Sequence, residues 1–195
     1  MSKVNLGQRA LIYPAPAVLI GANVAGRPNF MTAAFCGVVN GQPPMVSTSL
    51  QHHRYTLVGI KENYTFSVNI PSVGIMIETD YCGIMSGNKT DKVADCKFSL
   101  FYGKLTTAPM IDQCPINLEC KVVHILNLGT HALVIGQVED TFITESCLTD
   151  GKPDVEKIKP FLSAMGQYRE FGKTIGTSHI LGKQLKPQLF DNPKQ

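Results

Sequence analysis

The residues between positions 47 and 56 are of the types that bind a phosphate group. Ser47, Thr48 and Ser49 bring three hydroxyls to the end of a strand-like run, and Arg54 and Thr56 open a helix-like run. Hydroxyls, an arginine and the N-terminus of a helix together suit a phosphate dianion. The same residues also fit a Ser/Thr-rich strand followed by an ordinary capped helix, so this segment alone leaves both interpretations open.

A second stretch that suits an anion lies at residues 86–92. It begins with the small residues Ser86 and Gly87, which let the backbone approach a ligand, and it contains two cations, Lys89 and Lys92. A solvated surface loop would have the same composition. On its own, the stretch therefore does not distinguish a binding loop from a surface turn.

The nucleotide-binding and hydrolase motifs that we sought are absent or incomplete. Gly166 is followed after five residues by Gly172-Lys173-Thr174, which is one residue too many for a P-loop. No apolar strand-like run leads into this segment, and neither G-x-G-x-x-G nor G-x-S-x-G occurs in the sequence. These observations disfavour P-loop, Rossmann and α/β-hydrolase interpretations.

The five histidines do not form a metal-binding pattern, and we expect no metal. His52 and His53 are adjacent, so on a strand they would point to opposite faces and could not share one ion. His124 and His131 flank a predicted turn, and we expect them to face each other across a hairpin as a polar pair. Heme binding stays open as the basis of a non-enzymatic module.

The six cysteines stand at positions 36, 82, 96, 114, 120 and 147, and none forms a C-x-x-C pair. This spacing disfavours a zinc site. The N-terminus does not resemble a signal peptide, and no run of about 18 apolar residues predicts a membrane span. We therefore expect a cytoplasmic protein whose thiols are reduced and often buried.

Short strand-like segments dominate the chain, so strands must position the candidate phosphate-binding residues. Apolar or alternating runs predict strands at residues 17–22, 29–35, 45–50, 65–70, 116–124 and 131–141. Turn-type residues at 25–28 and 127–130 predict two hairpins. Helix-like patterns are brief, at residues 55–61, 72–80 and 155–161. Six or seven short strands with brief helices favour a closed or nearly closed barrel.

Length and charge point to one domain without a nucleic-acid groove. The chain has 195 residues, and its formal charge of +3 is scattered along the sequence. We expect one domain over residues 1–195 with a loose tail from about residue 187. Only 17% of the residues are charged, below the roughly 25% of a typical soluble domain, so a partner subunit is expected to cover part of the surface.

Read in order, several segments resemble the flavin reductase-like proteins with an FMN-binding split barrel. The resemblance rests on GRPNFMTAAF at 26–35, PPMVSTS at 43–49 and FSVNIP at 66–71. It continues through DYCGIMSG at 80–87, GTHALVIGQV at 129–138 and YREFGKTIG at 168–176. Within the family, the chain is most similar to the flavoredoxins. The glycine–lysine segment near residue 172 is then a structural element near the C-terminus.

The resemblance implies a mainly β fold, a six-stranded split β-barrel of Greek-key topology with short peripheral helices. It also implies a homodimer with FMN near the interface. The residues that would line the isoalloxazine ring are Asn29, Phe30, Met31, Thr32, Ala33 and Phe35. The residues that would meet the ribityl chain or the phosphate are Ser47, Thr48, Ser49, Arg54, Thr56, Ser86, Lys89 and Lys92.

The resemblance places a third group of residues against the flavin ring from other segments. Tyr81, Cys82 and Gly83 would approach the ring from one side. His131 would lie on the open flavin face, where a hydride donor could dock, and it is the one candidate catalytic residue. Because the flavin carries the chemistry, the protein need only bind and orient it.

The implied function is that of an FMN-dependent oxidoreductase or electron-transfer protein of the flavoredoxin type. NADH, NADPH or a redox protein would supply the electrons. One alternative is an NAD(P)H:flavin oxidoreductase that uses FMN as a diffusible substrate. The other is the non-enzymatic cofactor-binding module. We expect neither nucleic acid nor a membrane as a partner.

Overall fold

The two predicted hairpins form the centre of the fold. In the computed structural model, which describes residues 1–185, the first hairpin joins β2 (Val18–Val24) to β3 (Arg27–Ala33). Ala25 and Gly26 make the turn with φ angles of 49° and 77°, and glycine adopts that left-handed conformation readily. The second hairpin joins β9 (Ile116–Leu128) to β10 (His131–Ile143).

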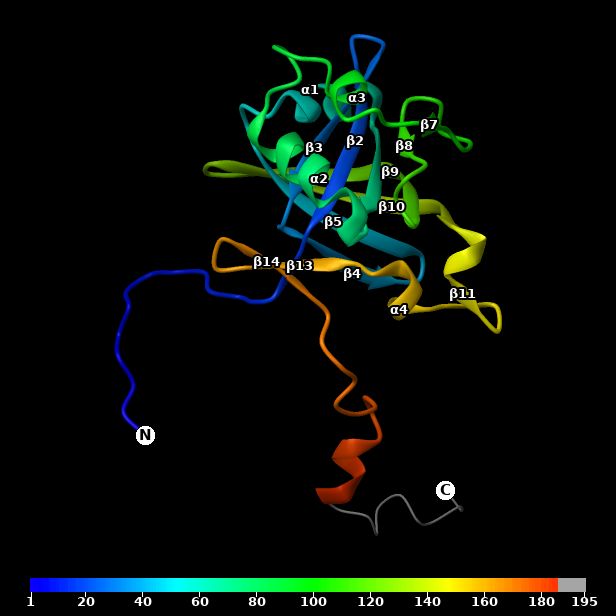
Figure 1. Cartoon of the computed structure of the whole chain (residues 1–195). Coiled ribbons are helices and arrows are strands. Elements are labelled where there is room, and N and C mark those ends of the chain that lie inside the picture. The colour runs from blue at the N-terminus through cyan, green and yellow to red at the C-terminus, as the bar shows by residue number, and fades with distance from the viewer. Residues whose placement is uncertain (186–195) are drawn as a thin grey trace.

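A seven-stranded antiparallel sheet contains both hairpins (Figure 1). Its other strands are β4 (Cys36–Gly41), β5 (Pro44–Gln51) and β6 (Thr65–Ile70). The strand order is β3-β2-β6-β9-β10-β5-β4, so neighbours in the sheet are often distant in the sequence. The chain is mainly β with short outer helices, as the sequence predicted.

The sheet has seven strands where the sequence predicted six or seven, and the six segments named as strands do not include β4. The run 29–35 ends as β3 at Ala33, and after two residues the chain continues as β4 at the opposite edge of the sheet. Phe35 lies in this connection, and its carbonyl accepts a 2.8 Å hydrogen bond from the Ser49 N–H of β5. No ladder within residues 1–185 joins β3 to β4, so the sheet curls toward a barrel without closing as one.

Both faces of the first hairpin are buried, against two different apolar clusters. Side chains of β2 and β3 alternate between them, because successive residues on a strand point to opposite faces. Ile20 and Met31 face the interior of the sheet with Phe66 and Val134. Leu19 and Phe30 face outward into a second cluster with Cys82, Phe98, Ile111 and Cys114.

Short helices pack against both faces of this hairpin, with Leu57 and Ile60 in the interior cluster and Cys82 and Val93 at the outer one. They are α1 (Tyr55–Asn63), the 3₁₀ turn η1 (Val73–Ile75), α2 (Met76–Ile84) and α3 (Lys92–Asp95). Helix α1 lies tightly on β2, since a Cβ at Gly59 would overlap with the Asn23 carbonyl. Helices α2 and α3 both contact β3. The predicted helix at 72–80 is therefore a 3₁₀ turn followed by α2.

Small elements complete the described chain. Strands β1 (Ala15–Pro16), β13 (Phe161–Ala164) and β14 (Gln167–Glu170) form a three-stranded sheet. Two-stranded pairs are formed by β7 (Leu100–Phe101) with β8 (Met110–Ile111), and by β11 (Leu148–Thr149) with β12 (Lys152–Pro153). The remaining short elements are η2 (Glu145–Cys147), α4 (Val155–Ile158) and η3 (Leu181–Leu185).

Three local predictions need correction or fall outside the described chain. The predicted helix at 155–161 ends as α4 at Ile158, where Lys159 takes a left-handed conformation with φ 48°, and Phe161 begins β13. Histidines 52 and 53 lie in the turn after β5 rather than on a strand. The predicted loose tail from about residue 187 lies outside the described residues.

Candidate functional site

Three adjacent hollows follow β3 from its end to its beginning. The edge hollow, of about 220 Å³, is lined by Met31, Thr32, Ala33, Ala34, Phe35, Ser49, Leu50, Gln51, Arg54 and His131. The central hollow, of about 130 Å³, is lined by Asn29, Met31, His53, Arg54, Tyr55, Thr56, Ile84, Met85, Ser86, Gly87 and Lys92. The outer hollow, of about 490 Å³, is lined by Arg27, Pro28 and Asn29 at the start of β3, by Tyr55, and by segment 87–93.

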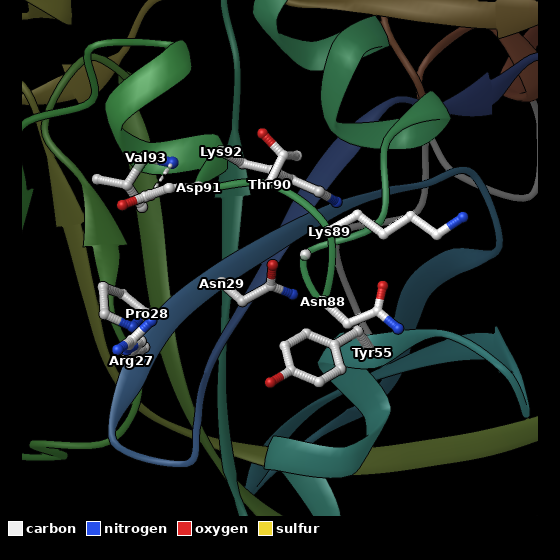
Figure 2. A pocket seen from close by; sticks show the side chains of 11 residues that line it. Arg27, Pro28, Asn29, Tyr55, Asn88, Lys89, Thr90, Asp91, Lys92 and Val93 are labelled. Atoms are coloured by element: carbon white, nitrogen blue, oxygen red, sulfur yellow. Dashed lines mark hydrogen bonds between the residues drawn. The ribbon is translucent and has the colours of Figure 1, made fainter.

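Shared lining residues make the three hollows one continuous trough. Met31 and Arg54 line both the edge and the central hollow. Asn29, Tyr55, Gly87 and Lys92 line both the central and the outer hollow. Figure 2 shows Asn29 in the middle of the outer hollow, between the β2–β3 turn and segment 88–90. An elongated ligand could therefore lie along β3.

Strand β3 offers backbone groups to such a ligand because it is an edge strand. Among the described strands it pairs with β2 alone, so the sheet leaves its other edge without a strand partner. One of its carbonyls, at Phe30, is instead bound by a lysine ammonium. The Thr32 hydroxyl donates to the Thr79 carbonyl of α2, which fastens the strand to that helix.

Two cations lie beside the central hollow at the C-terminal end of α2. The Lys92 ammonium donates to the carbonyls of Phe30 at 2.8 Å and Cys82 at 2.9 Å. The Arg54 guanidinium donates to the Gly83 carbonyl at 3.0 Å. Cations are favourable there because the last carbonyls of a helix carry partial negative charge.

Lys92 is buried, with only 4% of its surface exposed, which is rare for a lysine. Burial lowers the pKa of its ammonium below the ordinary value of 10.5, and the nearby Arg54 guanidinium acts in the same direction. An ammonium has three protons to donate, and two carbonyl partners leave it able to bind a further acceptor in the trough. Its position suits an anionic ligand.

The N-terminus of α1 opens onto the same central hollow. Its cap residue, Arg54, makes no side-chain capping hydrogen bond. The Leu57 N–H donates to the Arg54 carbonyl at 3.0 Å, and the N–H groups of Tyr55 and Thr56 are available to a ligand. The Thr56 hydroxyl in the first turn accepts a 2.7 Å hydrogen bond from the Asn29 amide, which positions both side chains. Together with Lys92, these groups form a site suited to a phosphate.

The edge hollow has a different lining, formed by strand backbone and rings. The Phe35 and His131 rings lie with their centroids 5.7 Å apart at a tilt of 40°. The Nδ1 atom of His131 lies 2.7 Å from the Thr130 hydroxyl, which fixes the orientation of the imidazole. A flat, conjugated group could lie here between β3 and β10.

Twelve of the predicted site residues line the trough. In the edge hollow these are Met31, Thr32, Ala33, Phe35, Ser49, Arg54 and His131. The central hollow adds Asn29, Thr56, Ser86 and Lys92, and the outer hollow adds Lys89. The structure thus brings together residues from four separate sequence segments.

Six predicted site residues do not line the trough. The side chains of Phe30, Thr48 and Cys82 are buried in the apolar clusters or the sheet interior. Ser47 lies on the same strand as Ser49 but away from the hollows. Tyr81 donates a 2.6 Å hydrogen bond to Asp95, and Gly83 contributes its carbonyl to Arg54.

Strand alternation explains why Thr48 lies inside. Val46, Thr48 and Leu50 point to the interior, whereas Ser47 and Ser49 point the other way. The Thr48 hydroxyl is buried and has no hydrogen-bond partner among residues 1–185. Cys82 is equally inaccessible, and burial raises the pKa of its thiol to about 12, so it is poorly suited to react as a thiolate.

Sequence reasoning did not include Arg27, Tyr55 or Gly87 among the site residues, although all three line the trough and Gly87 was noted as a position where the backbone could approach a ligand. Each lies in a segment that carries the family resemblance or was considered for anion binding, but the residue type alone did not show that it lines the trough. Gly87 is the clearest case, because a Cβ there would overlap with the Asn29 amide and approach the Tyr55 ring to 3.1 Å. The glycine between Ser86 and Asn88 was the feature of the sequence that could have indicated this close approach.

The predicted histidine pair and the glycine–lysine segment form no second binding site within the described residues. His124 is opposite Ile135 and His131 is opposite Leu128, so the predicted histidine pair across the β9–β10 hairpin is wrong. Within residues 1–185, no group of three or more His, Cys, Asp or Glu side chains could hold a metal ion. Gly166 lies in the β13–β14 turn, with φ 75°.

Membrane crossing by a helix finds no support in the described chain. Among the helices of residues 1–185, none combines the length and the apolar character that a crossing requires.

The comparisons with known proteins agree with this geometry. The family model described as "Flavin reductase like domain" matches residues 9–171. The crystal structure of flavoredoxin from Methanosarcina acetivorans is 41% identical, covers 95% of this chain and all of that one, and superposes with a TM-score of 0.91.

Two further proteins are similar over much of the chain. Flavoredoxin of Desulfovibrio vulgaris (Miyazaki F) is 35% identical, covers 93% of this chain and all of that one, and has a TM-score of 0.87. The FMN reductase (NADH) RutF of Pseudomonas syringae is 27% identical over 115 residues, which are 59% of this chain and 62% of that protein.

Proposed function

The chain belongs to the flavin reductase-like family, and on that premise we propose that it is an FMN-binding oxidoreductase that passes electrons through a flavin held along β3. The observation that carries the proposal is the central hollow. There the buried Lys92 ammonium, the Arg54 guanidinium and the uncapped N-terminus of α1 meet beside a hollow lined by strand backbone and rings.

The lining of the trough favours one orientation of bound FMN. The phosphate belongs in the central hollow, near Arg54, Lys92 and Thr56, because those groups offer positive charge and donors. The flat ring system belongs in the edge hollow, beside the free edge of β3 between Met31 and Phe35. The residues present therefore fit the group.

Bound FMN would supply the transfer of one or two electrons, which no protein side chain can supply. The chain's own residues bind and orient it. Lys92 and Arg54 neutralise the phosphate, and the braced backbone of β3 presents fixed donors and acceptors to the ring edge. The imidazole of His131, held by Thr130, borders the open side of the hollow, where a donor would dock.

The electron donor is proposed to be NADH or NADPH, or a reduced redox protein. The relative named FMN reductase (NADH) supports a nicotinamide donor, and it also supports a variant of the proposal in which FMN is a diffusible substrate. The two forms differ in how tightly the trough holds FMN, so steady-state kinetics with added FMN separate them.

Assembly and location form a further part of the proposal. We propose a homodimer, supported by exposed apolar side chains beside the edge hollow at Phe35, Val38 and Val39. Light scattering after gel filtration would measure its mass. All six cysteines are free thiols, which supports a reducing, cytoplasmic location.

The first experiment is an absorption spectrum of the protein purified without added cofactor, followed by heat release and chromatography of any chromophore. A flavin spectrum with stoichiometric FMN supports a tightly loaded electron carrier. A colourless, folded protein that binds FMN in a titration and shows saturation in FMN supports the diffusible-substrate form. A folded protein that neither binds FMN nor reduces it with any donor overturns the proposal.

A further inference from the structure

Two cysteines that the proposed function does not use lie against each other beside the trough. Cys82 is near the end of α2 and is buried, and Cys96 is the half-buried cap residue that follows α3. Both pack in the outer apolar cluster, and the two thiols hydrogen-bond to each other. Because the sulfurs are already in contact, a small side-chain movement would bring them to the bonding geometry of a disulfide.

The chain around the two thiols is tied across the same gap. The Cys96 thiol donates a 4.0 Å hydrogen bond to the Glu78 carbonyl, which lies one helical turn before Cys82 in α2. Between the residues next to the cysteines, the Tyr81 hydroxyl donates a 2.6 Å hydrogen bond to the Asp95 carboxylate. These contacts hold the end of α3 against α2, with Cys82 and Cys96 side by side.

The loop between the two cysteines forms the phosphate side of the trough. Every residue from 86 to 92 lines the central or the outer hollow. The Lys92 ammonium donates to the Cys82 carbonyl at 2.9 Å, and the Lys92 carbonyl accepts a 3.0 Å hydrogen bond from the Cys96 N–H. A bond between the two sulfurs would therefore join the two ends of this loop beside its buried cation.

The two thiols differ in a way that suits a two-step oxidation. Cys96 is the less buried of the two, so a small oxidant reaches it first. Burial raises the pKa of the Cys96 thiol above its ordinary value of 9.0, while the Cys82 hydrogen bond and the Lys92 ammonium favour its thiolate. The Cys82 thiol lies in place to react with the oxidised Cys96. Cys96 thus suits the role of the attacking sulfur and Cys82 that of the resolving sulfur.

We propose that Cys82 and Cys96 form a reversible disulfide, made by a peroxide, that closes the 86–92 loop and slows the release of FMN. The Cys96 thiolate attacks one oxygen of hydrogen peroxide and the O–O bond breaks. Cys96 becomes a sulfenic acid, and the other oxygen leaves as hydroxide, which takes up the thiol proton to form water. The Cys82 sulfur then attacks the sulfenic sulfur, and the hydroxyl leaves as water with the Cys82 proton. The two sulfurs together lose two electrons, the peroxide gains two, and a dithiol restores both thiols.

The effect on FMN follows from the position of the loop. Release of FMN requires the groups around its phosphate to move apart, and the loop forms one side of the central hollow. A covalent link at the base of the loop removes open conformations and keeps Lys92 in place. This effect rests on the proposed function, whereas formation of the disulfide does not depend on it.

The test combines peptide mapping with the kinetics of FMN release. Flavin-free and FMN-loaded wild-type protein are treated with hydrogen peroxide, the remaining thiols are alkylated, and the protein is digested with trypsin without reduction. Mass spectrometry should find peptides 62–89 and 93–97 joined, and dithiothreitol should separate them. On dilution, flavin fluorescence should show FMN leaving the oxidised protein about fivefold more slowly than the reduced protein.

Three variants control for other oxidation. Cys96→Ser removes the half-buried partner, so neither the joined peptides nor the slower release should appear. Cys82→Ala places an apolar side chain in the apolar cluster and should give the same result, which keeps the test open if Cys96→Ser does not fold. Cys36→Ser, at a half-buried cysteine of β4, is the matched control and should respond to peroxide as the wild-type protein does.

Several results would overturn the inference, and they are distinguishable. Folded protein in which peroxide leaves Cys82 and Cys96 unlinked, or links Cys82 to the buried Cys114 of the same cluster, overturns it. Joined peptides with an unchanged rate of FMN release also overturn it and leave the proposed function standing. Folded protein that binds no FMN in either redox state overturns the proposed function as well, while the peptide map of the flavin-free protein still reports the disulfide separately.

Discussion

Strands β3 and β4 are consecutive in the chain, two residues apart, yet they have opposite environments. Strand β3 is buried over most of its length and lines all three hollows. Strand β4 is exposed from Gly37 to Gly41, and Val38 and Val39 expose 80% and 50% of their surface. In the sheet formed by the described residues, both are edge strands with a single partner strand.

The difference comes from what packs against the strands rather than from their sheet positions. Helices α2 and α3 cover β3 and are tied to it by the Lys92 ammonium and the Thr32 hydroxyl. Strand β4 has no such helix among the described elements and pairs with β5 alone. An edge strand thus becomes a rigid binding surface when helices brace its free edge, and otherwise it is open to another chain.

The largest expected effect comes from removing the brace. Lys92→Met leaves the buried carbonyls of Phe30 and Cys82 without their cation, which should lower the free energy of unfolding by about 2 kcal/mol. Urea denaturation measures the change. Lys89→Met, at an exposed lysine in the same loop, should be nearly neutral. Equal stability of both variants would show that the ammonium does not brace β3.

Two glycine-to-alanine substitutions, one in the loop beside β3 and one on β4, compare how tightly the two strands are packed. In Gly87→Ala the new Cβ overlaps with the Asn29 side chain, so we expect a loss of about 2 kcal/mol in stability and weaker FMN binding. Gly37→Ala on β4 meets nothing within 4 Å and should change stability by less than about 0.5 kcal/mol. Denaturation and FMN titration of the two variants would test this, and equal losses would contradict it.

The protonation of Lys92 should make FMN binding depend on pH. Burial lowers its pKa, so in the folded protein it loses its proton at a lower pH than the exposed value of 10.5. As pH rises through that lowered pKa, the phosphate loses a cation and FMN affinity should fall about fivefold, or ~1 kcal/mol. The same deprotonation removes the cost of burying the charge, so it does not lower the stability of the fold.

Lys92→Arg separates this effect from other titrations. An arginine stays protonated over the whole range, so the affinity of the variant should be flat where that of the wild-type protein falls. Titrations of FMN at several alkaline pH values would measure both. An identical fall in the variant would assign the pH dependence to another group.

The smallest expected effect on stability is at the open edge. Val38→Ser changes a side chain that is 80% exposed, so the subunit itself should lose less than about 0.5 kcal/mol. If the exposed face of β4 lies in the proposed dimer, Val38→Lys should shift the protein toward the monomer, which light scattering would detect. A variant that stays fully dimeric would place the interface elsewhere.

Much of the sheet was predictable because strand periodicity is local. The runs 65–70, 116–124 and 131–141 alternate in a way that predicts β6, β9 and β10, and the turn residues predict both hairpins. Strand β4 was not predicted, and neither was the end of β3 at Ala33, because no glycine or proline marks the connection at Ala34 and Phe35. The register of β9 on β10 was also hidden, since irregularities near Gly136 shift it.

The candidate site was partly predictable for a similar reason. Residue types and order indicated Ser49, Arg54, Thr56 and the 86–92 loop as ligand contacts, and the structure places them along one trough. The interior position of Thr48 followed from alternation with Val46 and Leu50 and could have been read from the sequence. No comparable local pattern identified Tyr55 or Arg27.

The sequence by itself determined most strands of the main sheet, both hairpins and the family, and it indicated an anionic ligand, because these depend on local periodicity and on which residue types are present. Only the tertiary structure decided that Lys92 is buried between the Phe30 and Cys82 carbonyls, and that β3 is braced while β4 is open. Those outcomes join residues 10 to 62 positions apart. The burial of Lys92 and the bracing of β3 depend on packing between distant segments, which local sequence patterns do not encode.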